Sequence, residues 1–353
     1  MPCCGGRNRL PSNLPPTRSD RADREEVVNR LCLRVLAALA LASLPAGAAL
    51  SAEPTAQDYP ARPIRLIVSF PAGSSDVLGR AFAQYATLGQ PVVVENVPGA
   101  NGAIGLTRLA KSAPDGYTIA LGATTNLAVS PHLNPKLPYD PLKDFAPIAL
   151  LARVPIVLVV SSAVPARSVD ELVALARAHP GKLNYGSIGA GSTGHLLGET
   201  LRRRAGIDIV HVPYKGAAPG VTALLAGDVQ FLFFPVFVDA RALVRSGALR
   251  PLALVDSRRS PVAPDLPTLP ELGYPLEAAA WFALIAPAGT PEAIVQRLAQ
   301  EVRRVLSLEA MRRFLDDHGI EAGDLGPEAL KAYIASEHAR YGRMVRETGV
   351  QVE

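Results

Sequence analysis

The 353-residue sequence has little cysteine and few aromatic residues. Its three cysteines, Cys3, Cys4 and Cys32, all lie near the start, so the rest of the chain has no disulfide and no thiol chemistry. Aromatic residues make up 5% of the chain, and no basic stripe is interleaved with them, which argues against a nucleic-acid partner. There is also no HExxH motif, Cys/His cluster or closely spaced carboxylate pair. We therefore expect no metal, no cofactor and no glycosidase activity.

Only one long apolar run stands out, at residues 31–49, interrupted by Arg34 and ending in small residues. A basic flank, roughly 15 apolar residues and small residues at the end are typical of a secretory signal peptide. The run is too short to span a bilayer comfortably. We expect residues 1–52 to be a leader and signal peptide, with cleavage near Ala48 or Ala52, and the product to be an exported monomer.

Removal of that segment changes the charge balance. It carries seven of the 36 basic residues but only four of the 32 acidic ones, so the formal charge of +4 falls close to zero. The basic character of the whole chain is thus mostly a property of the leader. About 300 residues remain, which is enough for a large core and favours two domains over one.

Strands alternating with helices run through this remaining part. Apolar β-rich runs at residues 64–70, 91–95 and 117–121 each end in small polar residues. In an open α/β sheet, loops at the carboxyl ends of strands are where ligands bind. The pattern predicts an α/β fold.

Helix start signals support the same pattern. Ser168 and Glu171 form a capping box, and Thr290 before Pro291 is typical of an N-cap followed by proline at the first helical position. Pro327 opens a final amphipathic helix. Two further apolar runs, at residues 155–160 and 280–285, have the length of strands.

The stretch NYGSIGAGSTGHLLGE, residues 184–199, is the most distinctive part of the chain. A short strand breaks into a loop rich in glycine and hydroxyl residues, and a helix follows. Glycines permit close approach of a ligand to the backbone, and the helix N-terminus attracts anions. We interpret this loop as a site for a carboxylate or phosphate, formed by Ser187, Gly189, Gly191, Ser192, Thr193, Gly194 and His195.

Other interpretations of the loop remain open. Its glycines match the dinucleotide motif GxGxxG, but the next strand carries Asp208 at its start rather than an acid at its end. A P-loop is excluded, because His195 and Leu196 stand where Lys and Ser/Thr are required. Ser192 is a near match to a nucleophile elbow, which would make the protein an esterase-like hydrolase with His195 or His211 as base. A helix N-cap with a packed histidine is the structural alternative.

Eight segments together resemble one family. In chain order they are YPARPIRLIV from Tyr59, LGQPVVVEN from Leu88, PDGYT from Pro114, LPYDPLKDFAPI from Leu137, PGKLNYGSIGAGSTGHL from Pro180, HVPYKG from His211, LPTLPELG from Leu266 and APAGTP from Ala286. The sequence resembles the substrate-binding proteins of tripartite tricarboxylate transporters, the Bug family, over almost the whole chain after the leader.

The resemblance implies a two-lobed periplasmic binding-protein fold of type II, with a ligand cleft between the lobes. Residues 53–153 and 281–353 would form one lobe and residues 154–280 the other. The protein would bind a small organic carboxylate without acting as an enzyme, and its partners would be the membrane subunits of a transporter or, alternatively, of a sensor. The implied ligand residues are Phe70, Pro71, Ala72, Gly73, Ser74, Ser75, Asp76, Thr124, Asn126, Ser187, Gly189, Gly191, Ser192, Thr193, His195, Tyr214 and Lys215.

The sequence departs from the family pattern at three places, one of which is a helix from Arg80 to Leu88 that is about two residues short. The stretch from Phe70 to Asp76 is one residue shorter than in typical relatives. Phe234 stands where many relatives have aspartate, which would disfavour an amino-acid ligand if Phe234 lined the cleft. The alternative is that Phe234 belongs to the core, as aromatic residues in strands usually do. Lys215 is either a partner for a second carboxylate or a solvated surface charge.

Overall fold

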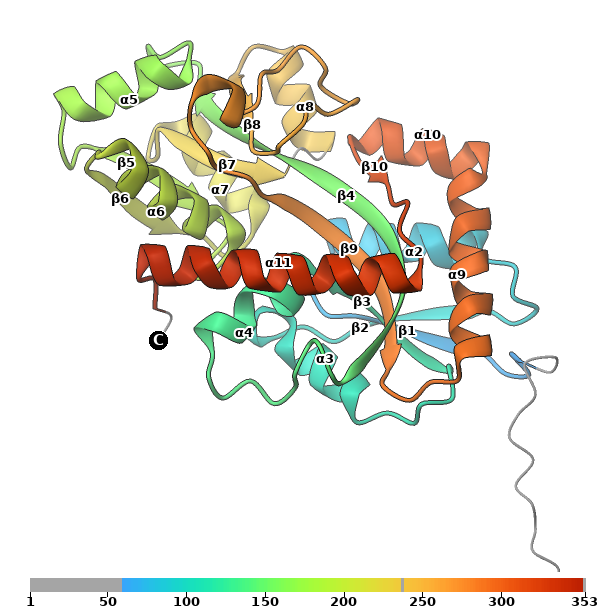
Figure 1. The fold of residues 1–353 in the computed structure, drawn as a ribbon. Coiled ribbons are helices and arrows are strands. Elements are labelled where there is room, and N and C mark those ends of the chain that lie inside the picture. Colours follow the sequence, from blue (N-terminus) through green and yellow to red (C-terminus); the bar gives the residue numbers. More distant parts are fainter. Residues whose placement is uncertain (1–58, 236–237, 352–353) are drawn as a thin grey trace, which may run out of the picture. The chain divides into compact units, whose positions relative to one another are not determined.

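The computed structural model describes residues 59–235 and 238–351. The predicted signal peptide lies outside these residues. The described chain is an α/β protein in which ten strands form one mixed sheet (Figure 1). The strand order is β2-β1-β3-β9-β4-β7-β5-β6, with β8 and β10 also paired to β4.

The strands are β1 (Ile64–Val68), β2 (Val92–Asn96), β3 (Thr118–Ala123), β4 (Phe145–Ser161), β5 (Leu183–Ser187), β6 (Ile209–Pro213), β7 (Phe231–Pro235), β8 (Leu249–Leu254), β9 (Ala279–Pro287) and β10 (Glu321–Ala322). The helices are α2 (Ser74–Tyr85), α3 (Ala103–Ala110), α4 (Ser130–Leu133), α5 (Val169–Ala178), α6 (Thr193–Ala205), α7 (Ala217–Ala226), α8 (Val238–Arg245), α9 (Glu292–Ser307), α10 (Glu309–His318) and α11 (Pro327–Thr348). Short helical turns are η1 (Ala100–Gly102), η2 (Thr125–Val129) and η3 (Pro270–Leu272).

Two groups of parallel strands lie at the ends of the sheet order. β1 pairs with β2 and β3 in parallel, and β5 pairs with β6 and β7 in parallel. Parallel strands in a doubly covered sheet are apolar along their whole length. This explains the continuous apolar run of β1, in which Ile64, Leu66, Ile67 and Val68 are fully buried.

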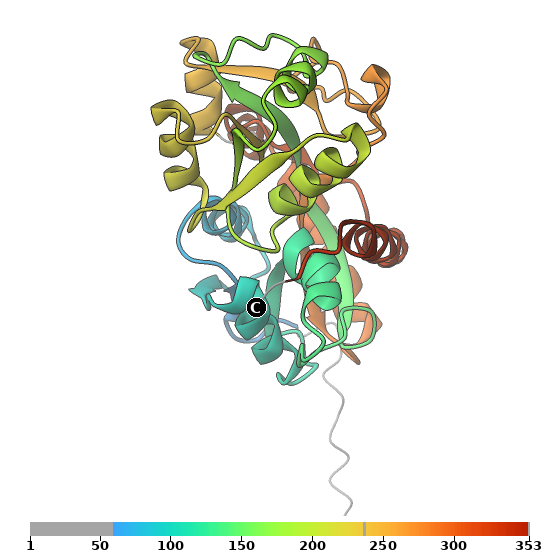
Figure 2. The same ribbon diagram turned by 90° about the vertical axis from the view of Figure 1, so that its left-hand side faces the viewer.

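The long strand β4 joins the two groups. Residues 145–155 of β4 pair antiparallel with β9, whereas residues 156–161 pair with β7 and β8. β9 in turn pairs with β3. The chain therefore passes between two lobes along β4 and returns along β9, and α11 runs beside these crossing strands (Figure 2). The predicted lobe boundaries near Arg153 and Trp281 stay a prediction, although these two residues pair directly in the β4–β9 ladder.

The predicted helix-start signals are confirmed only in part. Ser168 Oγ accepts a hydrogen bond from Glu171 N–H at 3.1 Å, while the Glu171 carboxylate accepts from Arg167 N–H instead of closing the box on Ser168. The predicted N-cap at Thr290 is wrong. α9 begins at Glu292 after Pro291, and the Thr290 hydroxyl donates to Pro287 O at 2.8 Å, which stabilises the preceding turn.

Candidate functional site

The first candidate loop, residues 70–76, connects β1 to α2. Its tip, residues 71–73, is exposed, and Ser74 begins the helix. Ser75 and Asp76 are 7% and 6% exposed. Because Asp76 lies in the first turn of α2, its charge interacts favourably with the positive end of the helix dipole.

A network of polar side chains holds this first loop. Arg80 Nε donates to Asp76 Oδ2 at 2.9 Å, and another Arg80 nitrogen donates to Asn96 Oδ1 at 3.1 Å. Asn96 Nδ2 in turn donates to the Phe70 carbonyl at 3.2 Å. Burial raises the pKa of the Asp76 carboxyl, but hydrogen bonds from Arg80 and Asn96 outweigh it and place that pKa below its usual range. The loop is therefore positioned by an ionised carboxylate.

A second group of candidate residues follows β3. The Thr124 hydroxyl accepts from Trp281 N–H at 2.8 Å and lies 3.3 Å from the Ala279 carbonyl, so it is engaged with β9. Asn126 is fully buried, and its Oδ1 accepts from Ala123 N–H at 2.8 Å. Its Nδ2 has no hydrogen-bond partner among the described residues. Asn126 thus has buried donors to offer, whereas Thr124 does not.

Ser69 is a residue that the sequence interpretation missed. It directly follows β1, is fully buried, and its Oγ also lacks a partner within the described chain. Gly102, just before α3, lies beside both unpartnered groups. A Cβ added at Gly102 would be 2.6 Å from Asn126 Nδ2 and 3.1 Å from Ser69 Cβ. The only sequence signal for Ser69 was a small polar residue closing an apolar strand.

The same position connects the first loop to the residues after β3. The Phe70 ring would be 3.2 Å from a Cβ at Gly102, close to Asn126 Nδ2. The loops after β1 and β3 therefore meet at the start of α3. A buried donor without an acceptor costs about 1–3 kcal/mol, so such groups are uncommon unless a ligand or water satisfies them.

The second candidate loop, residues 187–195, connects β5 to α6. Ser187 Oγ donates to Gly189 O at 2.9 Å and accepts from Gly189 N–H at 3.2 Å. Ser192 is the N-cap of α6, and its Oγ accepts from His195 N–H at 3.4 Å. Gly191 N–H donates to His195 Nδ1 at 3.1 Å. Several backbone donors that the sequence suggested for a ligand are thus used to shape the loop itself.

Two histidines, His195 and His211, contact residues of this second loop. The rings of His195 and His211 stack with centroids 3.8 Å apart and an interplanar angle of 5°. His211 Nε2 lies 2.7 Å from Ser187 Oγ. Burial lowers the pKa of His195, and burial together with the neighbouring His195 lowers the pKa of His211 to about 4. Both rings are therefore neutral at pH 7.

This geometry leaves the hydrolase alternative without its base. Within the described residues, no imidazole nitrogen bonds Ser192, because His195 Nδ1 accepts from Gly191 and His211 contacts Ser187. The dinucleotide alternative is not supported either. β6 ends at His211, Val212 and Pro213, with no acid where a ribose would bind.

The remaining predicted residues divide between loop and core. Tyr214 N–H donates to Ser187 O at 2.9 Å, which places Tyr214 beside the second loop, and Lys215 is exposed. Phe234 is 5% exposed and packs with Val157, Leu232 and other buried residues in a core cluster. This placement favours the core interpretation of Phe234, so its side chain gives no ground for excluding amino-acid ligands.

One tyrosine connects the two parts of the site. The Tyr341 hydroxyl on α11 is hydrogen-bonded to the side chain of Thr193, the first residue of α6. It also lies 3.5 Å from the Ala279 carbonyl, which the Thr124 hydroxyl contacts as well. The start of α6 and the end of β3 are therefore linked through α11 and β9.

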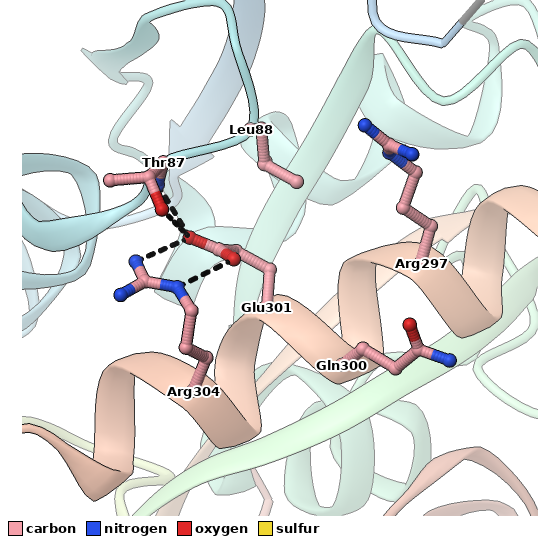
Figure 3. Close-up of a pocket in the computed structure, with 6 residues that line it drawn as sticks. All are labelled: Thr87, Leu88, Arg297, Gln300, Glu301 and Arg304. Carbon is pink, nitrogen blue, oxygen red and sulfur yellow. Dashed lines mark hydrogen bonds and ion pairs between the residues drawn. The ribbon is translucent and has the colours of Figure 1, made fainter. Parts of the chain in front are cut away.

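A surface pocket of about 370 Å³ lies elsewhere, between α9 and the segment that follows α2 (Figure 3). Glu301 lies in it and accepts from Thr87 N–H and from Arg304. Thr87 precedes β2, so the pocket lies near the amino ends of the parallel strands, away from the edge where ligands bind in such sheets. Its carboxylate is already neutralised, and we assign it a structural role.

The described residues contain no cluster of three or more potential metal ligands. In that same part of the chain, none of the helices has the length and apolar character needed to cross a membrane. Two lobes joined by crossing strands, with anion-type loops at helix N-termini, define the class of two-lobed binding proteins.

Comparison with known proteins agrees with that class. The model of the tripartite tricarboxylate transporter family receptor matches residues 80–350. Protein BugT of Bordetella pertussis is 39% identical over 329 residues, covering 91% of this chain and 99% of that protein. Two solved structures are similar: R. palustris Rpa4515 with adipate (35% identity, TM-score 0.75, 83% of this chain, 99% of that one) and MatC from Rhodopseudomonas palustris with bound malate (33%, 0.72, 81% and 100%).

The chain therefore belongs to the tripartite tricarboxylate transporter receptor family. This is a family of solute receptors rather than enzymes, and similar solved structures include a periplasmic transporter.

Proposed function

We propose that the protein captures a small organic carboxylate in the periplasm and delivers it to the membrane subunits of a tripartite tricarboxylate-type transporter. The observation that carries this proposal is a pair of buried groups beside Gly102, Ser69 Oγ and Asn126 Nδ2, which have no hydrogen-bond partner within residues 59–235 and 238–351. A carboxylate oxygen would accept from both. A side chain at Gly102 would occupy the space beside Asn126 Nδ2.

Helix termini add to this attraction. α3 begins directly after Gly102, next to these donors, and the first N–H groups of a helix carry a partial positive charge. Neither the loop at residues 70–76 nor the one at residues 187–195 contains Lys or Arg. The site is therefore suited to an anion held by neutral donors. The free energy of anion binding would come from hydrogen bonds to buried donors.

The similar proteins support a carboxylate ligand. One solved relative is named with adipate and another with malate, both dicarboxylates. Neither molecule is assigned to this chain by that similarity. The ligand class that both share is a small organic acid, and this class agrees with the donors around Gly102.

A thermal-shift screen of mono- and dicarboxylates, with aspartate and glutamate included, tests the proposal, because a ligand raises the melting temperature by mass action. Titration calorimetry on the best acid then compares Asn126→Asp with wild type. This variant keeps the acceptor for Ala123 N–H but replaces the free donor with a negative oxygen. We expect at least a tenfold loss of affinity, corresponding to about 1.4 kcal/mol.

Ser69→Ala should weaken binding by about 10- to 150-fold, since it removes one donor worth roughly 1.5–3 kcal/mol to a charged group. Ser112→Ala is the matched control. Ser112 lies just after the end of α3, where its hydroxyl donates to Arg108 O, and this variant should bind like wild type. If no acid in the screen binds, or if both site variants bind normally while folded, the proposed function is wrong.

Export is the second part of the proposal. Its support is the apolar run at residues 31–49 together with the periplasmic relative. Mass spectrometry of the periplasmic fraction should find a mature N-terminus near residue 49 or 53. If the protein were found only in the cytoplasm and with its leader intact, the proposal of export would be contradicted.

A further inference from the structure

The hydrogen bond between Gly191 and His195 determines where the proton of the imidazole resides. A backbone N–H can only donate, so His195 Nδ1, 3.1 Å from Gly191 N, must accept with its lone pair. The ring is then neutral and carries its proton on Nε2. A second proton on Nδ1 would turn this acceptor into a donor that faces another donor.

The neighbouring ring strengthens this constraint. His211 stacks on His195 at 3.8 Å and contacts Ser187 Oγ, which itself bonds both polar backbone atoms of Gly189. The two imidazoles thus brace the two ends of the turn at residues 187–191. Two cationic rings at this spacing would repel each other, so acidification disturbs the stack as well as the bond.

The other ionisable groups around the pair do not supply a free counter-charge. Glu199 on α6 is the nearest acid, and it raises the pKa of both histidines. Its carboxylate already accepts from the Tyr185 hydroxyl on β5 at 2.8 Å and from Arg202 on α6 at 2.8 Å. Burial remains the largest influence on each histidine and favours the neutral ring.

We propose that His195 is a proton-sensitive positioning residue of the loop at residues 187–195, which the sequence predicts to be part of the ligand site: a proton on Nδ1 breaks the bond to Gly191 N–H, deforms the turn at residues 187–191 and weakens carboxylate binding. The inference rests on the proposed function for its ligand. A cationic histidine would also attract a carboxylate, but the attraction acts on a loop whose backbone has lost its shape. Release of the ligand on acidification is the expected outcome.

Two measurements test this inference, one of them without ligand. In ligand-free protein at pH 7.5, nitrogen-15 NMR of the histidine rings should show His195 protonated on Nε2 only. The amide signal of Gly191 should then move with the titration of His195. A His195 ring protonated on Nδ1 at pH 7.5, or a Gly191 amide that does not respond, overturns the proposal whether or not any acid binds.

Calorimetry with the best acid from the screen is the second measurement. At one pH unit below the pKa of His195, roughly one tenth of the protein has the binding-competent loop, so affinity should fall about tenfold. His195→Asn keeps an acceptor at the position of Nδ1 but does not titrate, and its affinity should be nearly constant between pH 7.5 and 5. This variant also corrects for titration of the ligand itself.

His211→Gln is the matched control, because its amide keeps a donor toward Ser187 and leaves Nδ1 of His195 in place. It should retain the pH dependence of wild type with little change in midpoint, because burial and Glu199 shift the pKa of His195, while His211, with a pKa of about 4, is still neutral where His195 titrates. Equal pH dependence in His195→Asn and wild type, or tighter binding by wild type at low pH, would show that His195 does not act in this way.

Discussion

The indole Nε1 of Trp281 donates to the carboxylate of Glu337 at 3.0 Å, and both side chains are buried. Trp281 lies on the crossing strand β9, and Glu337 lies on α11. Arg340 bonds the same carboxylate at 2.7 Å. This relationship attaches the last helix to the strand that returns between the lobes.

Trp281→Phe should lower the free energy of unfolding by about 2–4 kcal/mol, because it removes the indole volume and leaves the Glu337 carboxylate short of a donor. Trp281 is the only tryptophan in the chain, so urea unfolding must be followed by circular dichroism rather than by fluorescence. A change below about 0.5 kcal/mol would show that the helix is held by other contacts.

Gly198→Ala in α6 should destabilise the protein by about 1–3 kcal/mol through overpacking. A Cβ there would lie 2.0 Å from the ring of the fully buried Tyr185. Gly220→Ala in α7 is the control, since its Cβ would have 3.8 Å to the nearest atom and alanine favours a helix. Equal melting temperatures for the two variants would contradict the prediction.

Stability should fall as the pH falls from about 6.5 toward 4. The pKa of His211 is lowered to about 4 in the folded protein, so between these values the unfolded state binds more protons than the folded one. The contribution is complete above pH 6.5 and is lost through this window. Melting temperatures of His211→Gln should decline less steeply with pH than those of wild type; parallel curves would argue against it.

Lys215→Ala should change carboxylate affinity by no more than about fivefold, the range of an exposed ion pair. Lys215 is exposed after β6. Ser192→Ala should instead cost about 1 kcal/mol of stability, because Ser192 caps α6. Calorimetry on Lys215→Ala measures the change in affinity, and melting curves of Ser192→Ala measure the change in stability. If Lys215→Ala abolishes binding, the ligand is held by a salt bridge.

Much of the candidate site follows from local pattern, and some of it does not. Glycine, serine and a helix start at residues 187–195 are enough to predict an anion-type loop, because φ freedom and free N–H groups are local properties. The use of Gly191 N–H by His195 is not predictable in this way. It depends on the rotamer that stacking on His211, from another strand, imposes on the ring.

Phe234 and Ser69 also show that a residue's environment in space cannot be predicted from local sequence. An aromatic residue in a strand has two faces available, and only the packing of β7 on β4 and β8 decides that Phe234 faces the core. Ser69 looks like an ordinary strand end. Its importance arises because Asn126 and Gly102, far from it in sequence, leave its hydroxyl buried with no partner among the residues that the structure describes.

The sequence by itself determined the α/β class, several of the strand and helix positions, the family and the position of the glycine-rich loop, since these depend on periodicity, turn chemistry and short ordered motifs. Only the tertiary structure decided which donors are free for a ligand. Hydrogen bonds engage the hydroxyl of Thr124 with the distant Trp281 and the N–H of Gly191 with His195, while Ser69 Oγ and Asn126 Nδ2 find no partner in the described part of the chain. Whether a polar group is satisfied depends on what surrounds it in space, and neighbouring positions in a sequence do not contain that information.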